Sequence, residues 1–317
     1  MQISARQPRR ACVLLLCAVG ACAPDAPPPA TDGPAQPDTA STATAPPAPD
    51  IVLADLSGSG TALTLSNARN ATDRPGYDNQ PAFTPDGRFL LYTQGEANGR
   101  TDVLRLDLTT GARQPVASTP DQSEYSALVP PDGRGVVVVR VEPDSTQRLW
   151  RTAVADEQVV FPDIAPVGYH AWVDERHVAL FVLGDPVTLV LADPTTGSTR
   201  VVDQRIGRSL QRVPGQRTVS YTAVPDSVAW IRGVDVDTGE THPIVPALEG
   251  SEDHAWTPDG VLLMGQGSRL YARDPGDPQG SWAQIADLSA LGSRISRIAV
   301  HPQGTQIAVV LEPAPAS

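Results

Sequence analysis

The sequence contains no lysine, and its three cysteines, Cys12, Cys17 and Cys22, all lie near the amino terminus. The rest of the chain therefore has neither a disulfide nor a cysteine-ligated metal site. Its 24 basic residues are all arginine and stand against 36 acidic residues. An acidic excess without a basic stripe argues against nucleic acid or anionic lipid as the main partner.

Common catalytic motifs are also missing from the sequence. It has no Gly-x-Ser-x-Gly nucleophile elbow, no His-Glu-x-x-His zinc motif, no phosphate-binding loop and no dinucleotide fingerprint. Apolar stripes with the period of a helix are absent as well, which argues against an array of helical repeats.

What the sequence does contain is one turn phrase that recurs at regular spacing. Full copies of this motif stand at Thr84–Arg88, Pro130–Arg134 and Thr257–Gly260. Degenerate copies, which keep only part of the motif, stand at 173–176, 213–217 and 301–304. The aspartate positions or their equivalents are 41 to 46 residues apart. Pro-Asp-Gly favours a tight turn, and short apolar runs follow it, such as Val136–Val139. This period is typical of a four-stranded propeller blade.

The two ends of the repeat region complement each other. After residue 303 only 14 residues remain, and 36 residues separate Asp50 from Asp86. Together these pieces amount to about one repeat. We therefore predict an all-β fold over residues 50–312, a six-bladed β-propeller closed by pairing of the amino-terminal strands with the carboxy-terminal blade.

The repeats resemble the TolB-type, WD-like propeller repeats of bacterial periplasmic proteins. The resemblance spans residues 50–312 and is strongest at Gln80–Arg88 and Ala255–Gly260. It is weakest in the third and fourth copies, where Gly215 replaces the aspartate. This family includes a translocation-system envelope protein, sugar-acid lyases and propellers attached to serine peptidases. The resemblance therefore implies a fold and no single function.

The first residues are typical of a processing segment. Residues 1–21 combine early arginines with a short apolar stretch, and Val19–Cys22 resembles a bacterial lipobox. We expect a lipoprotein-type signal peptide with lipidation at Cys22; an ordinary signal peptide with an incidental cysteine is the alternative. Ala23 after the cysteine indicates the outer membrane. Residues 22–49, rich in Pro, Ala and Thr, predict a tether, and 313–317 a short tail.

Polar residues stand just before or within the first strand of each expected blade. The family resemblance implies that these strands line the central channel, so the six segments converge on one of its mouths. Plain solvation of loop ends is the alternative. The candidate binding residues are Asn79, Gln80, Glu124, Tyr125, Tyr169, His170, Arg208, Gln211, Glu252, Asp253, His254, Arg294 and Arg297.

Two of these candidates are histidines in a shared phrase. His170 and His254 each begin a His-Ala-Trp sequence and align with Pro81 on the channel-facing strand. With nearby carboxylates they are candidate ligands for a divalent metal. Alternatively, each histidine bonds the backbone of a neighbouring blade. We expect no other cofactor.

Two functional hypotheses follow. The first is a non-catalytic, monomeric envelope lipoprotein that faces the periplasm, contacts the membrane through its lipid anchor alone, and binds a protein or peptide partner at the channel mouth. The alternative is a metal-assisted propeller enzyme, a lyase or hydrolase, that acts on an acidic sugar or small molecule. Arg208, Arg294 and Arg297 would then hold the anionic substrate.

Overall fold

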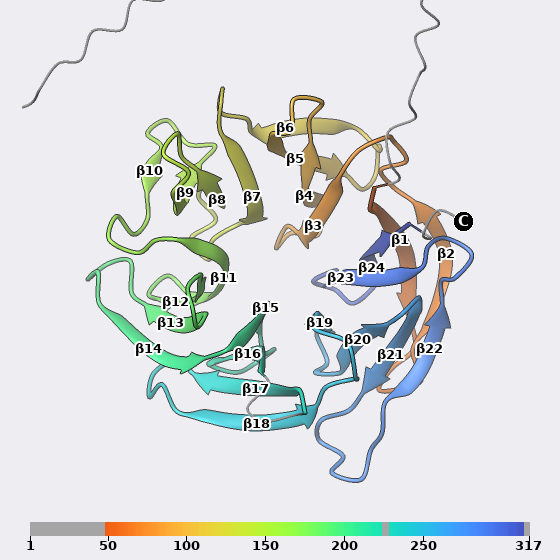
Figure 1. Ribbon diagram of the computed structural model, residues 1–317. Helices are drawn as coiled ribbons and strands as arrows, with labels where there is room; N and C mark the ends of the chain where they lie inside the picture. The colour runs from red at the N-terminus through yellow and green to blue at the C-terminus, as the bar shows by residue number, and fades with distance from the viewer. Residues whose placement is uncertain (1–47, 224–227, 314–317) are drawn as a thin grey trace, which may run out of the picture. The chain divides into compact units, whose positions relative to one another are not determined.

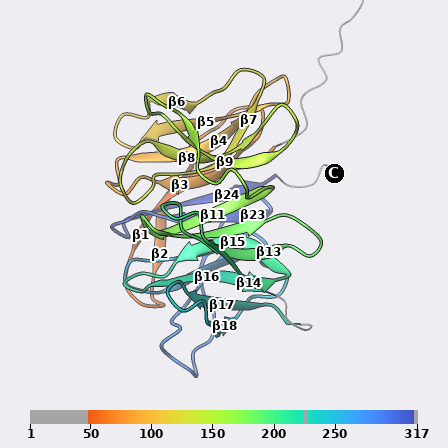
Figure 2. The same cartoon turned by 90° about the vertical axis from the view of Figure 1, so that its left-hand side faces the viewer.

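The computed structural model describes residues 48–223 and 228–313. Cys22, the predicted signal peptide and nearly all of the predicted tether and tail lie outside the described residues. The described part contains twenty-four β-strands and no helix. They form six four-stranded sheets around a central axis (Figure 1), and Figure 2 shows the same ring from its edge. The predicted six-bladed propeller is confirmed. Among the described residues, no helix has the length and apolar character needed to span a membrane.

Each blade contains four antiparallel strands, and the first strand in each of the following lists is the innermost. Blade 1 contains β3 (Asp78–Phe83), β4 (Phe89–Gly95), β5 (Thr101–Asp107) and β6 (Arg113–Ala117). Blade 2 contains β7 (Ser123–Leu128), β8 (Val136–Val141), β9 (Gln147–Thr152) and β10 (Gln158–Val159). Blade 3 contains β11 (Val167–Asp174), β12 (His177–Val182), β13 (Thr188–Ala192) and β14 (Thr199–Gln204).

The remaining blades follow the same plan. Blade 4 contains β15 (Ile206–Arg212), β16 (Thr218–Ala223), β17 (Trp230–Asp235) and β18 (Thr241–Pro246). Blade 5 contains β19 (His254–Trp256), β20 (Leu262–Gln266), β21 (Arg269–Arg273) and β22 (Ala283–Asp287). Blade 6 contains β23 (Arg294–Val300), β24 (Gln306–Glu312), β1 (Asp50–Ser57) and β2 (Thr64–Asn70).

Blade 6 is the one blade built from both ends of the described chain. Strand β1 pairs antiparallel with β24, from Asp50 opposite Leu311 to Asp55 opposite Gln306. The order across this sheet is β2-β1-β24-β23. The predicted closure is therefore confirmed, and it leaves no inner sheet edge open at the junction of the ring.

The recurring turn phrase connects the first two strands of a blade. In blade 1 the Thr84 hydroxyl donates to Asp86 Oδ1 at 2.6 Å and accepts from the Phe89 amide at 3.1 Å. The Arg88 amide donates to the same aspartate at 3.1 Å, and Gly87 has a φ of +70°. All of these bonds lie within residues 84–89, so the same short motif can form the same turn in different blades.

The hydrophobic core is divided into six clusters, each of which lies between two adjacent blades. Strand β24 shows how one strand supplies two of them. Ile307 and Val309 pack toward blade 5, and Ala308 and Val310 pack toward blade 1. Because alternate residues point to opposite faces and both faces are buried, such strands are apolar throughout.

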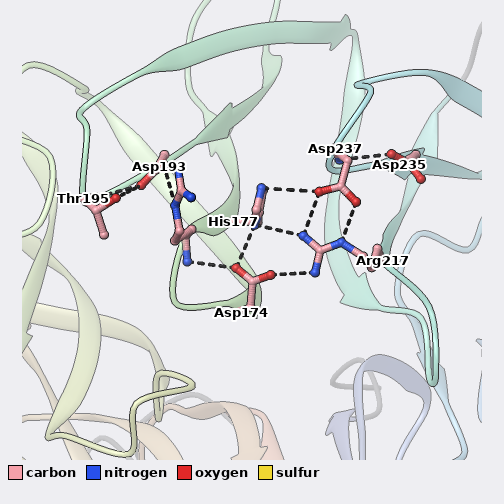
Figure 3. A network of polar contacts seen from close by, with 8 residues as sticks. Asp174, His177, Asp193, Thr195, Arg217, Asp235 and Asp237 are labelled. Carbon is pink, nitrogen blue, oxygen red and sulfur yellow. Dashed lines mark hydrogen bonds and ion pairs between the residues drawn. The ribbon is translucent and has the colours of Figure 1, made fainter.

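A polar network joins blades 3 and 4 at their turns, which are the degenerate third and fourth copies of the motif (Figure 3). Arg217 is the arginine of the fourth copy, two residues after Gly215, which replaces the aspartate. Its Nη1 bonds Asp174 of the third copy at 2.7 Å, and its Nη2 bonds Asp237 at 2.8 Å. His177 Nδ1 lies 2.7 Å from Asp174 Oδ1. An ion-pair network thus joins the two neighbouring turns that each lack one member of the Asp–Gly pair.

Candidate functional site

A cavity of about 560 Å³ occupies the central channel. It is lined by the inner strands of all six blades, β3, β7, β11, β15, β19 and β23, and by residues next to them. This volume lies within the range of pockets that bind small molecules or peptide side chains. We call the end of the channel at the starts of the inner strands the channel mouth. The Pro-Asp-Gly turns surround the opposite end.

Part of the predicted set lines this cavity: Gln80, Tyr169, His170, Arg208, Gln211, Asp253 and Arg297. The other predicted residues, Asn79, Glu124, Tyr125, Glu252, His254 and Arg294, are not among its lining residues. Glu124 is fully buried, and its Oε1 accepts from Arg140 Nε at 3.1 Å. Asn79 accepts from the Gln80 amide, and Arg294 lies 3.8 Å from Glu312.

Bulges in the inner strands decide which side chains face the channel. The pairing register shifts between Asn79 and Ala82 in β3 and between Tyr125 and Leu128 in β7. Gln80 and Ser126 adopt positive φ angles of 53° and 52° at these bulges. Gln80 Oε1 accepts from the Ser126 amide at 2.9 Å, so the bulges of blades 1 and 2 are bonded to each other.

His170 is held by two hydrogen bonds. Its Nδ1 accepts from Trp172 Nε1 at 2.9 Å, so its Nε2 carries the proton and donates to the Ser126 carbonyl at 2.9 Å. Ser126 belongs to blade 2, so His170 bonds the backbone of a neighbouring blade. Burial lowers the pKa of His170 to about 4, and the imidazole is therefore neutral at neutral pH.

His254 has different partners. It is fully buried, with Nε2 at 2.8 Å from the Ser220 hydroxyl and Nδ1 at 3.4 Å from the Thr222 hydroxyl, both on blade 4. Burial lowers the pKa of His254 to about 3. The two histidines come from blades 3 and 5, which are not adjacent, and their nitrogens bond other groups. Within 48–223 and 228–313, no cluster of three or more His, Cys, Asp or Glu residues suits a metal ion. The residues present therefore do not fit a divalent metal shared by these histidines.

A hydrogen bond crosses the channel at its mouth. Arg297 Nη2 on blade 6 donates to the Tyr169 hydroxyl on blade 3 at 2.9 Å. The guanidinium carbon also lies 5.5 Å from the centre of the Tyr169 ring. Blades 3 and 6 stand opposite each other in the ring (Figure 1), so this contact spans the diameter of the channel.

A second arginine reaches the same region from blade 4. Arg208 Nη1 lies 3.2 Å from Glu252 Oε2, and Arg208 Nη2 donates to the Ser296 carbonyl at 3.2 Å. Arg297 Nη1 donates to that same carbonyl at 2.8 Å. Two guanidinium groups thus converge on one neutral oxygen atom at the channel mouth.

Asp253 lies in the wall beside these arginines. Its Oδ2 accepts from the Ile298 amide at 2.9 Å. Burial raises the pKa of Asp253 to about 6, although the charges of Arg297 and Arg208 act to lower it. The carboxyl group therefore titrates close to neutral pH, which is common at binding and catalytic sites.

Sequence reasoning missed several residues of the cavity wall. Trp172, Trp256 and Phe83 line the cavity as well as packing between blades. Their position on the expected inner strands was the feature of the sequence that could have identified them as cavity-lining residues. His301, from the sixth turn phrase, lines the turn end of the channel, and its Nε2 lies 3.0 Å from the Gly87 carbonyl of blade 1.

No protein-family model matches the chain, and no curated protein matches its sequence. Among solved structures, a putative TolB from Agrobacterium tumefaciens is similar with a TM-score of 0.65 at 15% identity, covering 84% of this chain and 99% of that one. TolB from Acinetobacter baumannii gives 0.54 at 13% identity, covering 84% and 64%. Oligogalacturonate lyase from Vibrio parahaemolyticus gives 0.55 at 14% identity, covering 78% and 82%. These likenesses show the fold, a TolB-like six-bladed propeller, and the resemblance found in the sequence is confirmed at that level.

Proposed function

We propose that this protein is a non-catalytic cell-envelope lipoprotein whose TolB-like propeller binds a protein or peptide partner at the channel mouth. The observation that carries the proposal is the convergence of Tyr169, Arg208, Asp253 and Arg297 from four different blades on one cavity. Tyrosine and arginine are enriched among the residues that dominate binding energy at protein interfaces.

The lipoprotein part of the proposal comes from the sequence. The lipobox-like Val19–Cys22 and the proline-rich stretch that follows it support export and a tethered propeller. In the described part, the Pro49 carbonyl accepts from the Asp78 amide at the start of β3. The chain therefore enters the propeller on the face that carries the channel mouth.

Anchoring is tested with Cys22→Ala in the producing bacterium. The wild-type chain should incorporate radiolabelled fatty acid and sediment with the outer membrane, and the variant should do neither. Labelling that persists in the variant would contradict lipidation at Cys22.

Partner binding is tested by placing a photoreactive amino acid at single positions of the full-length protein. Tyr169 lines the cavity at the channel mouth, whereas Val201 is 63% exposed on the outer strand β14 and serves as the control. The proposal expects a crosslinked adduct of one discrete mass at Tyr169 and not at Val201. Identical adducts at both positions, or none at Tyr169, would contradict binding at the mouth.

The metal-assisted enzyme stays a prediction of the sequence. The arrangement of His170 and His254 gives it no support, because each histidine bonds a different neighbouring blade. We therefore propose no reaction for this chain, and a metal measurement described below tests the alternative.

A further inference from the structure

We propose that the channel mouth recognises a carboxylate group of the bound peptide, and that this carboxylate replaces the Tyr169 hydroxyl as the hydrogen-bond acceptor of Arg297. The inference rests on the proposed function, because it states which chemical group of the partner the mouth selects. It would make Tyr169 a neutral placeholder that the ligand displaces.

The first argument is that, within the described ranges, Arg297 bonds only neutral acceptors. Its Nη1 donates to the Ser296 carbonyl and its Nη2 to the Tyr169 hydroxyl. A guanidinium carries five N–H donors in a planar fork that matches a carboxylate. Hydrogen bonds to an ionised acceptor are roughly twice as strong as those to a neutral one. An incoming carboxylate therefore forms the stronger bond with Arg297.

The second argument is that donors beside Arg297 lack partners. The Nε of Arg208 and the hydroxyl of Ser296 are buried and have no hydrogen-bond partner in the described part of the chain. Ser296 is 5% exposed, and its carbonyl already accepts from both arginines. Buried donors are normally satisfied, and of these two residues Arg208 lines the cavity, so its unsatisfied donor indicates a missing acceptor there. An anion at this point offers several acceptor sites at once.

The third argument concerns the charge of the ligand. Glu252 already pairs with Arg208, and Asp253 lies in the wall close to Arg297. With two carboxylates beside two guanidinium groups, the mouth carries little net positive charge, so it offsets the desolvation of a doubly charged phosphate less well than that of a singly charged carboxylate. Apolar wall residues, among them Trp172, Trp256 and Ile298, remain free to contact the rest of a peptide.

The geometry also assigns a role to the Tyr169 ring. When Arg297 turns from the hydroxyl to the ligand, the ring keeps its edge-on packing against Phe181, with ring centres 5.5 Å apart. The residue that blocks the channel thus stays in place as an apolar wall for the entering chain. Removal of the hydroxyl alone should remove the competitor for Arg297 and leave this wall intact.

The test uses calorimetric titration of the full-length protein in detergent with two synthetic peptides, acetyl-(Ala-Glu)₃-amide and acetyl-(Ala-Gln)₃-amide. Wild-type protein should bind the acidic peptide at least about ten-fold more tightly than the neutral one, as expected for a charged hydrogen bond. Arg297→Gln should abolish this preference. Tyr169→Phe should strengthen binding of the acidic peptide by roughly three- to ten-fold, because a neutral hydrogen bond no longer competes.

The control variant is Arg269→Gln at the exposed first residue of β21, the third strand of blade 5, which removes the same charge far from the channel. Circular dichroism checks that every variant is folded. Carboxylate recognition would be overturned by equal affinities for the two peptides, or by a preference that persists in Arg297→Gln. Neither outcome would contradict partner binding at the mouth, which the crosslinking experiment tests separately. Failure of both peptides to bind, or binding of digalacturonate in place of the acidic peptide, would also overturn it.

Discussion

Ionisation of Asp253 at the channel mouth should lower the free energy of unfolding by a measurable amount. Asp253→Asn keeps an oxygen acceptor for the Ile298 amide but removes the ionisable group. Burial raises the pKa of Asp253 from 3.8 to about 6. One pKa unit corresponds to about 1.36 kcal/mol, so ionisation of Asp253 destabilises the native state by about 3 kcal/mol at most.

The sign of the pH dependence follows from linkage. The folded pKa lies above the unfolded one, so the folded state binds the proton more tightly. This contribution to stability is fully present below about pH 4 and is lost as the pH rises through about 6. Asp253→Asn should therefore be more stable than wild type by up to about 3 kcal/mol at pH 8, and equally stable at pH 4.

Urea unfolding at pH 4 and pH 8 measures this difference for wild type and variant. Asp156→Asn serves as the matched control, because Asp156 is exposed and loses the same charge. The reasoning is refuted if Asp253→Asn changes the unfolding midpoint equally at both pH values, or if the control behaves in the same way. A stabilised variant that binds the acidic peptide differently would show that the residue serves binding at the expense of stability.

Further predictions concern closure, packing, metal and pH. Leu53 is fully buried between blades 6 and 1, so Leu53→Ala should lower the free energy of unfolding by about 2–5 kcal/mol in urea. The exposed control Val201→Ala should change it by less than about 0.5 kcal/mol. Similar losses for both variants would contradict the closure argument. Gly265→Ala should cost about 1–3 kcal/mol, since its Cβ would lie 2.6 Å from Ile295 Cβ in the next blade, and an unchanged midpoint would refute that close approach. Purified protein should contain no stoichiometric Mn, Zn or Ca by elemental analysis, and its melting temperature should not rise when these ions are added; a stoichiometric metal would revive the enzyme alternative. The acidic peptide should bind more tightly at pH 5 than at pH 8 to wild type but not to Asp253→Asn, because protonation of Asp253 removes a repelling charge; a pH dependence that persists in the variant would assign it to another group.

The fold could be predicted from the sequence because its signals are local. Each Pro-Asp-Gly turn closes through bonds among its own residues, such as those from Thr84 and Arg88 to Asp86. The apolar runs identify strands that are buried on both faces. Closure followed from the lengths of the two end fragments, and the pairing of β1 with β24 confirms it.

The wall of the channel could be predicted only in part, because bulges change which face a residue occupies. The shift between Asn79 and Ala82 turns Gln80 into the channel wall and leaves Asn79 buried. A repeat alignment carries no information on such shifts. His170 and His254 share one phrase, yet β11 contains register shifts and β19 contains none. His170 lines the cavity, whereas His254 is fully enclosed.

The composite sixth blade has a consequence for how this protein is made. Its inner pair, β23 and β24, is synthesised last, and its outer pair, β1 and β2, is synthesised first. Strand β1 can pair early with β2, but its other edge stays without its partner until residues 306–311 have emerged. Such long sequence separation between partners slows folding. A product that terminates early would present the apolar faces of blades 1 and 5 to solvent, and proteases and chaperones recognise such surfaces. The apolar faces of blades 1 and 5 are buried only when β23 and β24 have joined the ring. A chain that lacks these strands is therefore open to removal, whereas a closed ring is protected.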